Sequence, residues 1–205
     1  MLPLPFSPGY TVFLNVPFDR RYRPLFLALL GGLAVLGREP HCVLEIPSDG
    51  QSRLDRIYGL IERCSASIHD LSRTSLSGAL RVPRFNMPFE LGLACSIARR
   101  QKHSFFVLEQ HPYRLQASLS DLNGHDPHIH QGTQDGILRF LLDCFGAADG
   151  PQPTFPALRS LVRKLSGIVA DLEQEHRIQH PFHPYVFRQA VVAAAKLARA
   201  EGLIA

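Results

Sequence analysis

Short apolar runs alternate with amphipathic stretches along the first two thirds of the chain. The runs are rich in β-branched and aromatic residues and end at turn residues, which is typical of buried strands. They predict strands over residues 11–16, 41–46, 65–71 and 102–109. Apolar residues at helical spacing predict helices over residues 20–36, 52–64 and 88–101. This alternation predicts an α/β fold, a mostly parallel sheet with helices on both faces.

The pattern weakens after the fourth predicted strand. A short fifth strand is expected within residues 126–131, followed by a helix over residues 135–145. Residues 148–156 are rich in Gly, Pro and Asp and form the best boundary in the chain. We therefore place an α/β domain at residues 1–148 and a C-terminal helical segment at residues 149–205. Two amphipathic helices are expected in that segment, and their apolar stripes must pack on the α/β domain or on a second chain.

Composition narrows the class of protein. Hydrophobic residues make up 45% of the chain, which is enough for a packed core, and the net charge is +4. That charge suits an anionic ligand but is too small and scattered to indicate nucleic acid. Four separated cysteines without a paired motif, and no basic leader or apolar run long enough to span a bilayer, favour a cytoplasmic protein that does not enter the membrane.

One acidic residue, Glu90, lies inside the apolar stretch FNMPFELGLA at residues 85–94. The predicted helix start at Pro88 places Glu90 in the first turn, near the positive end of the helix dipole. A carboxylate there stays ionised more easily, which suits a nucleophile or a stabiliser of a cation. The alternative is a carboxylate that only complements the dipole.

Further candidates follow the predicted strands, because ligands of parallel α/β sheets bind at the carboxyl ends of the strands. The first strand leads into Asn15, Pro17, Phe18 and Asp19. The third strand leads into Asp70 and Arg73, and the fourth ends at Glu109. Each has an ordinary structural alternative: Phe18 as a core residue, and Asp19 or Asp70 as the cap of a helix or turn.

Three short motifs follow one another along the sequence: NVPFD at residues 15–19, SIHD at residues 67–70 and ELGLA at residues 90–94. Together they resemble the nucleoside 2-deoxyribosyltransferase-like family and, more distantly, the TIR-type NAD-cleaving domains. The resemblance covers roughly the first 130 residues of the chain. It implies a flavodoxin- or Rossmann-like fold and a hydrolase or transferase that cleaves an N-glycosidic bond without a cofactor or metal.

The resemblance also implies roles at the matching positions. Cleavage passes through an oxocarbenium-like transition state, which Glu90 attacks or stabilises while Asp70 binds the ribose. Phe18 packs on the base or nicotinamide, with Asp19 assisting. The further substrate-binding candidates are Asn15, Pro17, Arg73, Asn86, Asp121 and Asn123.

Arginine-rich loops beside these motifs favour a phosphorylated substrate, so NAD hydrolysis, as in bacterial defence systems, is the first expectation. Base exchange or deoxyribosyl transfer is the second. The alternatives are a nucleotide sensor without turnover and an interaction subunit that recruits a partner protein through its helical tail. The C-terminal helices favour a homo-oligomer. His125, His128 and His130, with Asp121 and Asp126 nearby, form a less favoured zinc or manganese alternative.

Overall fold

The structure is a computed structural model. It describes residues 10–45, 50, 52–73, 85–122, 124–146, 152–180 and 182–204, without the side chain of Asp121. The chain divides into two compact units. The sheet unit comprises Thr11–Pro17 and His41–Gly132, and the helical unit comprises Met1–Tyr10, Phe18–Pro40 and Thr133–Ala205.

A five-stranded sheet organises the sheet unit, although the first two residues of one edge strand, Glu39 and Pro40, are grouped with the helical unit. Its strands are β1 (Thr11–Asn15), β2 (Glu39–Cys42), β3 (Ala66–Asp70), β4 (Ser104–Glu109) and β5 (His128–Ile129), in the order β2-β1-β3-β4-β5. The pairs β1–β3, β3–β4 and β4–β5 are parallel. The predicted α/β class is confirmed, and the strand order is that of flavodoxin-like folds. Because Asn15 pairs with His69 and Asp70 with Leu108, the carboxyl ends of these strands meet at one edge.

The second strand is shorter at its carboxyl end than the pattern predicts. It ends at Cys42 and turns into the 3₁₀ helix η1 (Val43–Glu45). The Glu45 carboxylate accepts a 2.8 Å hydrogen bond from the Cys42 N–H and lies 2.9 Å from His41 Nδ1. These local side-chain bonds compete with strand pairing, so the apolar Val43 and Leu44 leave the sheet.

The helices of the sheet unit are α2 (Arg53–Arg63), α3 (Asn86–Ala98), α4 (Arg114–Ser118) and the 3₁₀ helix η2 (Ser120–Leu122). Two apolar clusters hold them on the sheet. In the first, Ile57 and Ile61 of α2 and Ala94 and Ile97 of α3 pack with Phe13 of β1. In the second, α3 and α4 pack with β4 through Met87, Leu91, Leu115 and Val107. Helix α3 is thereby fixed against β1 and β4, and it also contacts β3.

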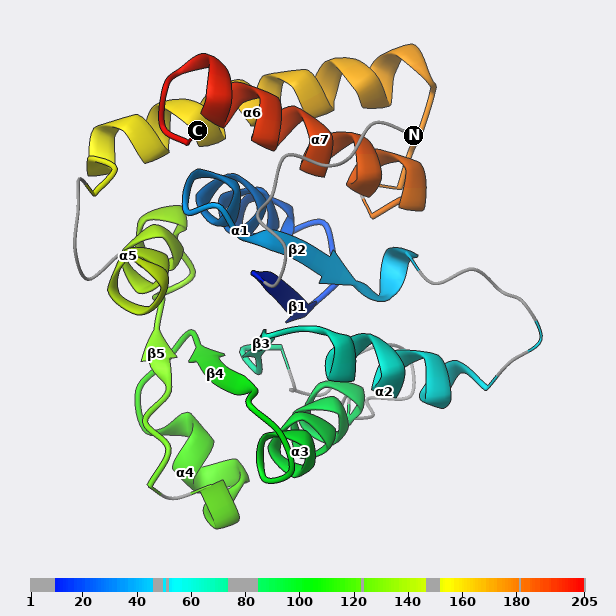
Figure 1. Cartoon of the computed structure of the whole chain (residues 1–205), viewed down its shortest axis with the longest axis vertical. Coiled ribbons are helices and arrows are strands. Elements are labelled where there is room, and N and C mark those ends of the chain that lie inside the picture. Colours follow the sequence, from blue (N-terminus) through cyan, green and yellow to red (C-terminus); the bar gives the residue numbers. More distant parts are fainter. Residues whose placement is uncertain are drawn as a thin grey trace. The chain divides into compact units, whose positions relative to one another are not determined.

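The helical unit is built around α1 (Arg23–Val35), whose residues from Leu25 to Val35 are all buried. Helices α5 (Gln134–Phe145), α6 (Phe155–Glu175) and α7 (Pro184–Ala200) pack on it, as Figure 1 shows. Two adjacent glycines permit this close packing. A Cβ on Gly31 would lie 2.9 Å from Val162 of α6, and a Cβ on Gly32 would lie 2.5 Å from Leu141 of α5.

The two C-terminal helices thus bury their apolar stripes within this chain. Buried residues of α6 are Leu158, Leu161, Val162, Leu165 and Val169. Because α1 and α7 cover this stripe, a second chain is not needed for that purpose. The predicted boundary between residues 148 and 149 lies outside the described residues, and the contacts group α1 and α5 with the C-terminal helices. In the described part of the chain, no helix is long and apolar enough to cross a membrane.

Candidate functional site

The candidate carboxylate Glu90 lies deeper in its helix than the sequence predicts. Helix α3 begins at Asn86, two residues before the predicted start, so no acidic residue lies in its first turn. Glu90 is only 8% exposed, and its carboxylate has no hydrogen-bond partner within the part of the chain that the structure describes. Burial raises the pKa of Glu90 to about 7, against the opposing positive charge of Arg53. The expectation of an easily ionised carboxylate is therefore wrong, because burial outweighs the dipole.

Asn15 links the first two sequence motifs to helix α3. Its amide nitrogen donates one 2.9 Å hydrogen bond to the backbone carbonyl of Met87, in the first turn of α3. Its second hydrogen points to Nδ1 of His69 on β3, also at 2.9 Å. Asn15 itself ends β1. One buried side chain therefore ties the first motif to the second and to the helix that carries Glu90.

The hydrogen bonds continue from Asn15 across the sheet in one direction. His69 Nδ1 accepts from Asn15, so the His69 hydrogen is on Nε2 and is donated to Ser67 Oγ at 2.8 Å. At the far end, His103 Nδ1 must donate to the Cys64 carbonyl, because a carbonyl only accepts. Ser67 then donates to His103 Nε2 at 2.9 Å. Each of these hydrogens has an acceptor while both rings are neutral.

Burial keeps these two histidines uncharged. It lowers the pKa of His69 to about 3, with a smaller effect from the neighbouring His103. The pKa of His103 is also lowered, by burial, although its bond to the Cys64 carbonyl opposes this. Sequence reasoning missed this network. The available signal was the period-2 spacing of Ser67 and His69, which places two polar side chains on one buried face.

Asp70 is fully engaged at the end of β3. Its Oδ1 accepts a 2.9 Å hydrogen bond from the Ser72 N–H, and its Oδ2 lies 3.2 Å from His130 Nε2. His130 Nδ1 accepts from the Gly132 N–H, so Nε2 carries the hydrogen that faces the carboxylate. Asp70 is 0% and His130 1% exposed. In this arrangement Asp70 caps a turn and offers no oxygen to a sugar.

The two predicted catalytic carboxylates also belong to different faces of the sheet. Successive strand residues point to opposite faces, so Asp70 points away from the face that carries His69. The ring of His69 contacts Phe13, which packs against α3. The predicted pairing of Asp70 and Glu90 around one sugar therefore has no support in this geometry.

Glu109, at the end of β4, is likewise held by its surroundings. It is 2% exposed, and its Oε1 accepts 2.7 Å and 3.4 Å hydrogen bonds from the Gln110 N–H and Arg114 Nη1. Arg114 Nη1 also donates to the Ser72 carbonyl at 2.8 Å. These contacts join the ends of β3 and β4.

Two predicted substrate-binding residues belong to the helical unit, where they have structural contacts. Phe18 packs in an aromatic cluster with Phe26 and Phe182, at ring-centroid distances of 6.0 and 5.2 Å. Asp19 Oδ1 accepts hydrogen bonds from the N–H groups of Arg21 and Tyr22 at 3.0 and 3.1 Å. These are the contacts of a core aromatic residue and of a turn cap.

The remaining predicted residues contribute less to a site. Pro17 is buried, Arg73 is partly exposed, and Asn86 is exposed as the first residue of α3. The side chain of Asp121, and Asn123 as a whole, lie outside the described residues.

The three clustered histidines separate in space. His125 packs on Phe105 and His128 on Phe106, which are successive residues of β4 and so lie on opposite faces of the sheet. His130 faces Asp70 instead. Among the residues that the structure describes, no three His, Cys, Asp or Glu side chains are placed to hold a metal.

No family model matches the chain, and no curated protein or solved structure gives a match. The resemblance to the nucleoside 2-deoxyribosyltransferase-like family therefore rests on the three motifs and their spacing.

Proposed function

We propose that this protein cleaves the N-glycosidic bond of a nucleotide or nucleoside, with NAD hydrolysis as the first candidate reaction. The observation that supports the proposal is the buried Glu90 carboxylate, which has no hydrogen-bond partner in the described part of the chain. The ionised form of a buried acid of this kind costs stability, and such groups gather at functional sites.

The charge of the reacting group explains why such a carboxylate suits this reaction. An N-glycosidic bond breaks through a sugar that carries positive charge at its anomeric carbon, and the nicotinamide of NAD is cationic before cleavage. A cation beside Glu90 favours the ionised carboxylate and offsets its burial. In this mechanism Glu90 stabilises or attacks the developing cation.

Asn15 is the second residue of the proposed site. Both of its amide hydrogens are committed, to His69 and to Met87, so the orientation of the amide is fixed. Its carbonyl oxygen remains to accept a hydrogen bond from a sugar hydroxyl. In this mechanism Asp70 does not bind the substrate, and its carboxylate orients His130 instead.

The direct test is product analysis by mass spectrometry after incubation of the full chain with NAD and a panel of nucleosides and nucleotides. Glu90→Gln keeps the size of the side chain and removes the charge, so turnover should fall by about 100-fold or more. Glu62→Gln, at an exposed position of α2, is the matched control and should cleave like the wild type. Wild-type turnover by the Glu90 variant would remove this residue from the mechanism.

The pH dependence gives an independent check. Because burial raises the pKa of Glu90 to about 7, the ionised form that the mechanism needs accumulates only above that pH. We expect kcat/KM to rise with pH through about 7 and then level off. A rate that falls over the same range would require Glu90 to act as an acid.

A nucleotide-binding module without turnover is the second candidate. It is favoured by the state of Asp70, whose carboxylate is buried and engaged, so that the site lacks a second carboxylate on the side of Glu90. In that case NAD or another nucleotide raises the melting temperature while no product forms.

We propose that the protein is cytoplasmic and that it forms a homo-oligomer. Light scattering on the full chain tests the assembly directly. A monomer at working concentration would leave the proposed activity intact, because Asn15 and Glu90 belong to one compact unit.

A further inference from the structure

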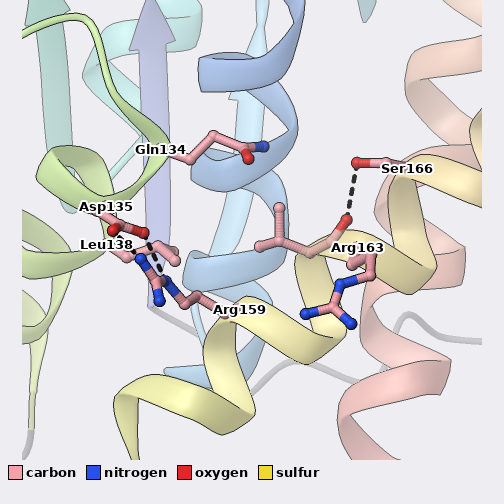
Figure 2. Close-up of a pocket in the computed structure, with 7 residues that line it drawn as sticks. Gln134, Asp135, Leu138, Arg159, Arg163 and Ser166 are labelled. Carbon is pink, nitrogen blue, oxygen red and sulfur yellow. Dashed lines mark hydrogen bonds and ion pairs between the residues drawn. The ribbon is translucent and has the colours of Figure 1, made fainter.

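A pocket of about 450 Å³ lies between α5 and α6 in the helical unit. Its apolar lining residues, Leu138 and Val162, are buried against α1. Figure 2 shows that Arg159 of the pocket is already paired with Asp135. The described side chains of this pocket therefore offer no apolar surface to a ligand. The histidines where α6 ends and α7 begins have surroundings that say more.

Three exposed histidines, His176, His180 and His183, lie close together in this part of the helical unit. Two of them accept hydrogen bonds from the backbone. His183 is the N-cap of α7, and its Nδ1 accepts a 3.2 Å hydrogen bond from the Tyr185 N–H. His180 Nδ1 accepts a 3.2 Å hydrogen bond from the Phe182 N–H. Both imidazoles thus act as caps of the backbone around the start of α7.

These two caps exist only while the imidazoles are neutral. A ring nitrogen of histidine accepts a hydrogen bond through its lone pair, and a proton on that nitrogen turns it into a donor. Histidine takes up this second proton between about pH 8 and 5. A positive charge on His183 is also unfavourable beside the positive end of the α7 dipole. Acid therefore removes both caps.

The third histidine responds to acid in the opposite way. His176 is the C-cap of α6, where the helix dipole favours a positive charge. Its Nε2 lies 3.4 Å from the Tyr185 hydroxyl, and the two ring centroids are 5.0 Å apart. A protonated Nε2 can still donate to the hydroxyl oxygen. Acid thus retains the contact of Tyr185 with the end of α6 while it removes the contact of Tyr185 with His183.

The charged groups around the three rings are mostly basic. Within the described residues, no carboxylate forms an ion pair with any of these rings. Glu173 of α6 is paired with Arg23 of α1 at 2.9 Å, and Asp19 Oδ1 accepts from backbone N–H groups. The other charged side chains of this region and of the elements packed on it are Glu175, Arg177, Arg20 and Arg188. Their excess of positive charge does not offset protonated rings.

Phe182 is the apolar side chain that lies between the two caps. It is 3% exposed, and its ring centroid lies 5.2 Å from that of Phe18 and 5.3 Å from that of Phe26. His180 bonds to its own N–H, and His183 holds the turn of helix that follows. Loss of both bonds frees the backbone on either side of this aromatic contact.

We propose that His180 and His183 form an acid-sensitive latch at the start of α7. At about pH 8 the latch is closed. At about pH 5 both caps are lost, the first turn of α7 opens and Phe182 loosens from its aromatic cluster, whereas the end of α6 stays ordered. The latch lies in the helical unit and does not depend on the proposed glycosidic activity.

The experiment measures amide hydrogen exchange of the full chain by NMR at pH 8 and pH 5, corrected for the intrinsic exchange rate at each pH. The protection of the Tyr185 and Phe182 amides should fall about fivefold or more at pH 5, the effect of losing a helix cap. The amide of Leu29, in the buried part of α1, is the internal reference and should keep its protection.

Variants assign the response to single rings. Asparagine accepts the same backbone bonds and does not titrate in this range. His183→Asn should therefore remove the pH response of the Tyr185 amide, and His180→Asn that of the Phe182 amide. His176→Asn, at the end of α6, is the matched control and should leave both responses in place.

Three results would overturn the proposal. Equal protection of the two amides at both pH values would mean that the caps do not respond to acid. A loss at Leu29 as large as the loss at Tyr185 would mean that the whole unit opens. A response that persists in the double variant His180→Asn/His183→Asn would place the titrating group elsewhere. Because both histidines are exposed, the variants are expected to fold, and a circular dichroism spectrum checks this.

Discussion

Asn15 contacts both a buried hydrogen-bond network on the sheet and the helix that carries Glu90, and the surroundings of the network and of the Glu90 carboxylate differ. In the network of Asn15, His69, Ser67 and His103, each hydrogen identified above has an acceptor. Glu90, on the helix that the same asparagine contacts, has no hydrogen-bond partner in the described part of the chain. The network fixes how β1, β3 and α3 pack together, whereas the ionised Glu90 carboxylate lowers the free energy of unfolding.

This difference in surroundings distinguishes a structural polar group from a candidate catalytic group better than residue type does. Histidines often signal catalysis, yet His69 and His103 are satisfied and neutral, and their bonds rigidify the sheet. Burial raises the pKa of Glu90 although the positive charge of Arg53 opposes this, and a cation bound beside the carboxylate would favour its ionised form further. The two groups also respond to pH with opposite signs, which makes the comparison testable without a substrate.

The largest expected effect is that of His69→Ala. The change leaves a cavity and deprives Asn15 and Ser67 of their bonds, so the free energy of unfolding should fall by about 3–5 kcal/mol at pH 7. The folded pKa of His69, about 3, lies below its unfolded value, so the stability that neutral His69 provides is lost as pH falls below about 6.5. The difference from the wild type should therefore shrink by about 2 kcal/mol at pH 5.

Urea denaturation at both pH values measures this difference. His111→Ala, at an exposed position, is the control and should change stability little. An equal loss of stability from the two variants would mean that the network does not hold the sheet together.

Glu90→Gln should have the opposite effect, a gain of stability. The folded pKa of about 7 lies above the unfolded value of about 4.3, so the protonated acid stabilises the fold at low pH, and this contribution is lost as pH rises through 7. Glutamine stays neutral at all pH values. At pH 8 the variant should be more stable by about 3 kcal/mol, and at pH 4.5 the two proteins should differ little. A variant that is less stable than the wild type at pH 8 would show that the carboxylate has a partner.

Asn15→Asp tests the contact with the His69 ring and the contact with helix α3 in one experiment. A carboxylate at this position loses the bond to the Met87 carbonyl and favours a proton on Nδ1 of His69. We expect the pKa of His69 to rise and the stability at pH 8 to fall by about 1–3 kcal/mol. Nitrogen-15 NMR of the histidine rings follows the tautomer and the pKa. Asn86→Asp, at an exposed position of α3, is the matched control and should leave the His69 ring unchanged.

Hydrophobic periodicity predicted most of the fold, because it depends on neighbours within a few residues. The predicted strand over residues 65–71 and helix over residues 52–64 match β3 and α2 to within one residue at each end. The strand over residues 41–46 did not match, because the Glu45 side chain bonds to the backbone of Cys42. A hydrogen bond of this kind, between a side chain and the nearby backbone, cannot be detected from the pattern of apolar residues.

The candidate site was harder to predict, since its properties arise from distant contacts. Sequence alone placed Asn15 and Glu90 near one edge of the sheet, but the raised pKa of Glu90 depends on how deeply α3 is buried. One of the two aromatic neighbours of Phe18 is Phe182, from the C-terminal part of the chain. The ion pair of Asp70 depends on His130, which directly follows β5. None of these pairs shares a periodic pattern.

The smallest effect expected here separates the charge of Glu90 from the stability of its helix. Gly92 lies in α3, two residues after Glu90, and a Cβ at this position meets no atom within 4 Å. Gly92→Ala should stabilise the protein by about 0.5–1 kcal/mol, because alanine loses less backbone entropy in a helix. Since no charge changes, the gain should be the same at pH 4.5 and pH 8, and any turnover should be retained. If the gain in stability of Gly92→Ala is instead larger at pH 8 than at pH 4.5, as expected for Glu90→Gln, then the pH response assigned to Glu90 comes from the packing of α3. In that case the Glu90 carboxylate is not its cause.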